Sequence, residues 1–100
     1  MNQEKILSTL QQHIPAPAVD YCFNLWLKYK FVFKLRKARI TKVGDFTFRS
    51  GHTPRITVNS DLHPYSFLIT YVHEVAHLEA HSIFGHRVEA HGEQWKKTFQ

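Results

Sequence analysis

The spacing of apolar residues predicts two helices in the first third of the chain. Residues 3–12 form a short amphipathic helix with Ile6, Leu7 and Leu10 on one side. The proline-containing segment 14–18 ends it, and a second helix runs from about Pro17 to Tyr29. Four residues of this second helix follow helical spacing and are expected in the core: Cys22, Leu25, Trp26 and Tyr29.

Residues 31–59 change to an alternating pattern that is typical of β-strands. Residues 31–40 form the first expected strand, 46–50 the second and 55–59 the third. Val43-Gly44-Asp45 and Ser50-Gly51-His52 supply residues that favour the intervening turns. The region therefore predicts a small three-stranded antiparallel sheet within an α+β domain.

A long helix is predicted from Pro64 to Phe84, because this stretch has no internal glycine or proline. Asp61 or His63 is placed to cap its start, and Gly85 is a stop signal. The side chains expected to pack inward are Leu68, Val72, Val75 and Ile83, flanked by Tyr65, Ile69 and Ala76.

The middle of this helix carries His73-Glu74-Val75-Ala76-His77, an HExxH sequence. Two histidines four apart lie on the same helix face, so both imidazoles can reach one Zn²⁺ ion. Glu74 then lies beside a zinc-bound water and can take its proton. The pattern predicts a zinc-dependent hydrolase, most simply a peptidase.

Catalytic zinc usually has three protein ligands, so a third is expected outside the pentapeptide. His91 is the favoured candidate, because Gly92 and a helical EQWKKTF segment follow it and let the chain present it from a second helix. His86 and Glu93 remain alternatives. His81 lies one further turn along the helix from His77, a rise of about 6 Å, which is too far for it to share the ion easily. The metzincin pattern HExxHxxGxxH does not fit, since Ala80 and Ile83 occupy its glycine and last histidine positions.

YVHEVAH, followed fourteen residues after His77 by HGEQWKKTF, resembles the SprT-like metallopeptidases, a family that includes the eukaryotic protease Spartan. RITKVGDFTF (39–48) and PRITVNSDL (54–62) are similar to the strand segments before that family's active-site helix. The resemblance implies a minimal zincin-like fold with a short C-terminal helix. It also implies His73, His77 and His91 as zinc ligands, Glu74 as catalytic base, and proteins associated with DNA as substrates.

Other parts of the catalytic machinery are less defined by sequence. The candidates for a second group stabilising the oxyanion are Tyr65, His81, His86 and Arg87, although each is also compatible with an ordinary packing or surface position. A peptide substrate is expected to add as a strand along the sheet edge near 52–58.

Length favours a single domain covering residues 1–100, and the resemblance implies that it is a SprT-like metallopeptidase domain. SprT-like proteins often continue into a cysteine-rich zinc ribbon, so this short C-terminus suggests a truncated chain. The single Cys22 excludes an intramolecular disulfide and suits a cytoplasmic protein, and neither a signal peptide nor a membrane-spanning apolar run is evident.

The charge pattern adds a second expected partner. The chain has a net charge of +5, and no acidic residue lies between Asp20 and Asp45. The basic segment 28–42 holds seven cations: Lys28, Lys30, Lys34, Arg36, Lys37, Arg39 and Lys42. Such a segment can contact a DNA backbone, or it can simply keep a sheet face solvated. The alternative to a peptidase is therefore a non-catalytic module that binds zinc or nucleic acid.

Overall fold

A computed structural model describes residues 2–84 of the 100-residue chain and confirms the α+β class. Its elements in chain order are α1 (Gln3–His13), a 3-10 turn η1 (Ala16–Ala18), α2 (Val19–Tyr29), β1 (Val32–Arg36), β2 (Gly44–Thr47), β3 (Arg55–Asn59) and α3 (Pro64–Phe84). The predicted C-terminal helix and Gly85 stop signal lie outside these residues. Within the described part, no helix is both long and apolar enough to cross a membrane.

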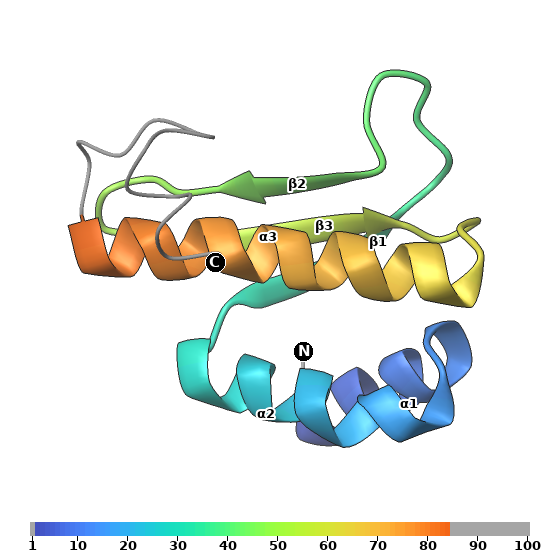
Figure 1. The fold of residues 1–100 in the computed structure, drawn as a ribbon. Helices are drawn as coiled ribbons and strands as arrows, with labels where there is room; N and C mark the ends of the chain where they lie inside the picture. Colours follow the sequence, from blue (N-terminus) through green and yellow to red (C-terminus); the bar gives the residue numbers. More distant parts are fainter. Residues whose placement is uncertain (1, 85–100) are drawn as a thin grey trace.

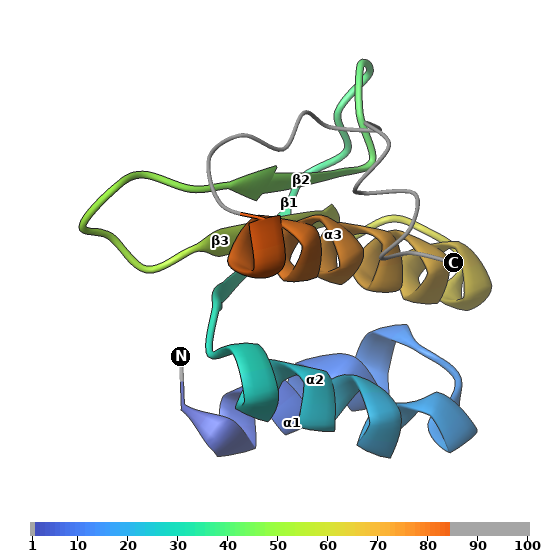
Figure 2. The same ribbon diagram turned by 60° about the vertical axis from the view of Figure 1, so that its left-hand side comes forward.

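The helices and the sheet form successive layers, with α3 in the middle (Figures 1 and 2). Helices α1 and α2 pack against each other on one side of α3, and the three strands lie on its other side. Because α3 contacts both β2 and β3, the HExxH sequence is held between helices and sheet.

The sheet is mixed, and the expected fully antiparallel arrangement is wrong. The strand order is β1-β3-β2, with β3 parallel to β1 and antiparallel to β2. The reason lies in residues 37–43, which carry the chain past the position of β3 instead of making a tight hairpin after β1. A second correction concerns Gly44 and Asp45, which were expected in a turn but belong to β2 and pair with Val58 and Thr57.

Aromatic side chains form the centre of the core between α3 and the sheet. The ring of Phe33 on β1 meets Phe67 and Tyr71 edge-on, at centroid distances of 6.3 and 5.4 Å. All three side chains are buried. The Tyr71 hydroxyl donates a 2.8 Å hydrogen bond to the Cys22 carbonyl, which ties α3 to α2.

The buried face of α3 differs in part from the expected one. Val75 is buried, as expected, while Leu68 and Val72 are only partly buried. Ile83 was expected inside but is 60% exposed. The ring of His81, two residues earlier, packs on the sheet. Ile83 is about 200° further around the helix axis and therefore points away from the sheet.

His63, one of the two proposed caps, begins α3. Its carbonyl accepts the Phe67 N–H at 2.8 Å, and its Nδ1 accepts the Tyr65 N–H at 3.2 Å. The Phe67 bond is the first regular bond of the helix, and the Tyr65 bond pairs one N–H of the first turn that the helix itself leaves unpaired.

Cys22 is fully buried in α2, as expected for a small core residue. Burial raises the pKa of its thiol to about 11, which keeps it protonated at neutral pH.

Candidate active site

The two histidines of the pentapeptide point their outer ring nitrogens at the same place. His73 and His77 lie on successive turns of α3, half-buried, with Nε2 atoms 3.1 Å apart and rings nearly perpendicular. A tetrahedral zinc with bonds of about 2.0–2.1 Å separates two nitrogen ligands by about 3.3 Å. The geometry of this pair therefore fits two ligands of one zinc ion.

Glu74 lies on the side of α3 that faces the sheet, and it is 8% exposed. The backbone of β2 crosses directly over it at Gly44. A Cβ atom added to Gly44 would lie 3.2 Å from Glu74 Oε2 and 2.5 Å from Thr70 Cγ2. The absence of a side chain at Gly44 therefore lets β2 approach α3 closely at the level of the carboxylate.

This environment raises the pKa of Glu74 from 4.5 to about 7. Burial is the largest cause, because it penalises the charged form, and the negative charge of Asp45 adds to it. Arg39 and Lys42 act in the opposite direction. A carboxyl with a pKa near neutrality can both take and release a proton at the pH of most cells.

A small cavity gives access to the carboxylate from outside. It has a volume of about 140 Å³ and is lined by Asp45, Phe46, Glu74 and His77. Helix α3 supplies Glu74 and His77, while β2 supplies the opposite wall. The arrangement brings Glu74 and His77 to a common opening where a water and a small part of a substrate can enter.

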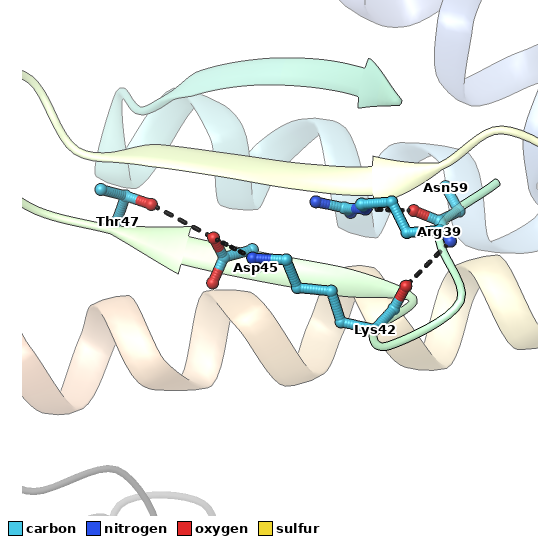
Figure 3. Close-up of polar contacts among 5 residues, drawn as sticks. All are labelled: Arg39, Lys42, Asp45, Thr47 and Asn59. Carbon is cyan, nitrogen blue, oxygen red and sulfur yellow. Dashed lines mark hydrogen bonds and ion pairs between the residues drawn. The ribbon is translucent and has the colours of Figure 1, made fainter. Parts of the chain in front are cut away.

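Polar groups around Asp45 connect this wall to the neighbouring loop (Figure 3). Lys42 Nζ lies 3.1 Å from Asp45 Oδ2, and the Thr47 hydroxyl donates to the same oxygen at 3.4 Å. Asn59 Nδ2 donates to the Lys42 carbonyl, and Arg39 Nε donates to Asn59 Oδ1 at 2.7 Å. These contacts fix the loop that precedes β2 and with it the charges nearest to Glu74.

His91, the predicted third ligand, lies outside the described residues, as do both of its alternatives, His86 and Glu93. Within residues 2–84, no group of three or more His, Cys, Asp or Glu side chains is arranged to hold a metal. His81, the remaining candidate, packs its ring against Phe46 and Phe48 at centroid distances of 5.9 and 4.2 Å. The His81 side chain therefore lies against the sheet, one helical turn beyond His77.

Of the four residues considered for the oxyanion, the structure describes two. Tyr65 lies in the first turn of α3, 63% exposed, and its ring stacks on His63 at 5.7 Å. Tyr65 is two helical turns before His73, and its ring stacks on His63, so its side chain is distant from Glu74. His81 has the sheet contacts described above, and His86 and Arg87 fall outside the described part.

Two expectations about the sheet change with its topology. Residues 52–58 do not form an edge, because β3 is the central strand, so the predicted site of peptide addition is wrong. The residues beside Glu74 on β2, namely Gly44, Asp45 and Phe46, were not identified from sequence. Their signal was present in the alternation from Gly44 to Thr47, but glycine and aspartate together favoured a turn.

The basic segment 28–42 is divided among several surroundings. Lys28 lies over the Tyr29 ring, 5.1 Å from its centroid, and Lys42 pairs with Asp45. Lys34 and Arg36 are exposed on β1, on the face away from Phe33, as the alternation predicted. Six of the seven cations are exposed, and Arg39 is partly buried.

Comparisons with known proteins give a short match. Proteins called SprT from Pseudomonas putida are 63% identical to this chain over 27 residues, and those of Pseudomonas entomophila and Pseudomonas fluorescens are 59% identical over 27 residues. The aligned segment is 27% of this chain and 16% of each relative. No family model and no solved structure matches. A quarter of the chain is thus similar to SprT proteins, and this similarity supports a SprT-like relationship at most.

Proposed function

We propose that this chain is the metal-binding part of a zinc-dependent peptidase of SprT-like type. The observation that carries the proposal is the position of Glu74, which shares a small cavity with His77 while the His77 and His73 nitrogens lie 3.1 Å apart. The similarity to SprT proteins supports the same reading. His91 is proposed as the third ligand.

Zinc bound by these histidines would supply a Lewis acid and a water of lowered pKa. Glu74 takes the proton of the attacking water and returns it to the amine that leaves when the peptide bond breaks. The close contact with β2 holds the carboxylate in place.

The substrate is proposed to lie along the outer edge of β2. Within the described part of the chain, β2 pairs with β3 alone, so its other edge has backbone groups available to an extended peptide. Asp45 and Phe46 on this strand line the cavity with Glu74, and a peptide paired with them would bring a carbonyl to the catalytic opening.

The test is cleavage of an unfolded protein by zinc-loaded wild type, Glu74→Gln and Glu79→Gln. Glu79 lies on the same helix but accepts a hydrogen bond from Tyr29, so its variant is the matched control. Glu74→Gln should retain zinc and lose activity by at least about 100-fold, the scale of general-base catalysis. Wild-type rates in Glu74→Gln would refute the mechanism.

Elemental analysis of purified protein tests the ligand set separately. Wild type should hold about one zinc per chain, the number expected for a single catalytic site, and His91→Ala should lose it. Retention of zinc in that variant would move the third ligand to His86 or Glu93.

A second candidate is a module that binds zinc or nucleic acid without cleaving protein. The specific observation in its favour is the exposed pair Lys34 and Arg36 on the sheet. Zinc binding together with no cleavage, in the presence or absence of DNA, would favour this candidate over the peptidase.

A further inference from the structure

A second cavity lies at the β2–β3 hairpin. It has a volume of about 290 Å³ and is lined by Thr47, Arg49, His52, Thr53 and Arg55, which we call the hairpin pocket. None of these residues lines the Glu74 cavity. The hairpin pocket is therefore a separate candidate site.

The backbone brings these side chains together from both arms of the hairpin. Thr47 and Arg55 are direct cross-strand partners, so their side chains leave the sheet on the same face. At the tip, the His52 N–H donates to the Arg49 carbonyl at 3.0 Å, and Gly51 has φ +82°. This turn folds His52 and Thr53 back towards Arg49.

All five lining residues can donate hydrogen bonds, and two are permanently cationic. Two guanidinium groups, one imidazole and two hydroxyls match the several oxygens of a phosphate group. Within residues 2–84, the one ion pair is Lys42–Asp45, so no described carboxylate neutralises Arg49 or Arg55. Thr47 does donate to Asp45, but that carboxylate is already paired with Lys42.

The positive charge continues from the pocket across the sheet. Arg55 pairs with Val32 and Thr57 with Lys34, so Arg55, Lys34 and Arg36 emerge on the face opposite α3. All three are exposed. A polymer of phosphates is the ligand that would use both the pocket and this row of cations, because its charges repeat along a chain.

Two buried donor atoms without a partner lie on the same face, and neither lines the hairpin pocket. Thr57 lies on β3, two residues from both Arg55 and Asn59, and its buried Oγ1 atom has no hydrogen-bond partner. Arg39, which crosses this face to reach Asn59, has a buried Nη2 atom that is also unpaired. Figure 3 shows the Arg39 side chain extended beside β3.

We propose that the hairpin pocket binds one phosphate group of a nucleic-acid strand whose backbone continues over Lys34 and Arg36. Arg49 and Arg55 grip the phosphate oxygens, and the threonine hydroxyls and His52 complete the contact. The site does not share residues with the proposed zinc site, so it stands whether or not the chain cleaves protein.

The experiment measures binding of a fluorescein-labelled oligothymidylate of twelve nucleotides by anisotropy. The test variant is Arg49→Gln/Arg55→Gln, and the matched control is Lys5→Glu, which lowers the net charge by the same amount at an exposed position on α1. The test variant should bind at least about ten times more weakly, and its salt dependence should decrease by about 0.7 in slope, as for the loss of one phosphate contact to a single strand. The control should change affinity less than about twofold.

Equal losses in the two variants would overturn the proposal, because they would show attraction to net charge alone.

The source of the phosphate is tested by titrating wild type with inorganic phosphate at constant ionic strength. Arginine-dependent binding of inorganic phosphate, with oligonucleotide binding unaffected by the test variant, would also overturn it in favour of a free-phosphate site. Far-ultraviolet circular dichroism and thermal unfolding test whether each variant is folded. The variant Arg49→Lys/Arg55→Lys should recover part of the affinity, because the positive charge remains while the bidentate geometry of arginine is lost.

Discussion

At the scale of single residues, Gly44 decides how closely the sheet approaches the Glu74 carboxylate. Its position on β2 leaves 2.5 Å between an added Cβ and Thr70 Cγ2, less than any normal contact. The strand therefore rests on α3 without a side chain between them. Any larger residue must push β2 away from Glu74 or displace Thr70.

Gly44→Ala should destabilise the protein by about 1–3 kcal/mol, the usual cost of overpacking. Adding Thr70→Ser removes the methyl group that the new Cβ would meet, so the double variant should recover most of the loss. Urea unfolding measures both.

Gly51→Ala is the control for Gly44→Ala. Nothing lies within 4 Å of an added Cβ there, so its cost of about 1 kcal/mol comes from the positive φ. Thr70→Ser should not rescue it. A Gly44→Ala protein as stable as wild type would show that β2 can move freely from α3.

Glu74 makes stability depend on pH in the metal-free protein. Its pKa is raised in the folded state, so folding favours the protonated carboxyl; this contribution is fully present below pH 4.5 and is lost as pH rises through about 7. Glu74→Gln stays neutral at every pH. We expect the variant to match wild type near pH 4.5 and to exceed it by up to about 3 kcal/mol at pH 8.

Urea unfolding in the presence of a chelator, at pH 4.5, 6 and 8, measures this difference. Comparing the two proteins at each pH removes most of the contribution of the neighbouring histidines. A constant difference across the series would show that the carboxyl titrates normally.

At the scale of elements, the end of α2 contains a residue in an unfavourable conformation. Lys30 has φ 50° and ψ 51°, the left-handed region, while its N–H donates to the Trp26 carbonyl at 2.8 Å. Glycine usually occupies such a helix end because it has no Cβ to strain. The turn is still required, since it directs Phe31 into the core and starts β1.

Lys30→Gly should therefore stabilise the protein by about 0.5–1 kcal/mol. The measurement is the midpoint of thermal unfolding, with Lys28→Gly as control, because Lys28 lies within the helix and glycine there should destabilise by about 1 kcal/mol. Destabilisation by both variants would mean that Lys30 makes a contact worth more than its strain.

Most elements could be predicted from local patterns. The long helix has the expected bounds, and the two shorter helices differ from expectation only near their ends. His63 could be proposed as a cap because it precedes Pro64. Gly44 and Asp45 could not be assigned correctly, since their local preference is for turns and only pairing with Val58 and Thr57 places them in a strand.

At the scale of the whole molecule, sequence could predict that His73 and His77 lie together but not what surrounds them. His73 and His77 follow from helical spacing alone. The wall formed by Asp45 and Phe46 depends on β2 lying at the sheet edge above α3, which no local pattern specifies. The hairpin pocket likewise depends on register, because Thr47 faces the same side as Arg55 only through their pairing.

Among the described strands, the last to be synthesised is β3, which lies in the centre of the sheet. β1 and β2 do not pair with each other, so neither gains a backbone partner until residues 55–59 arrive between them. Helices α1 and α2 contact each other through residues close in sequence and can associate earlier. On the ribosome, the sheet and the cavity around Glu74 therefore assemble together, as one late event completed when α3 packs on them.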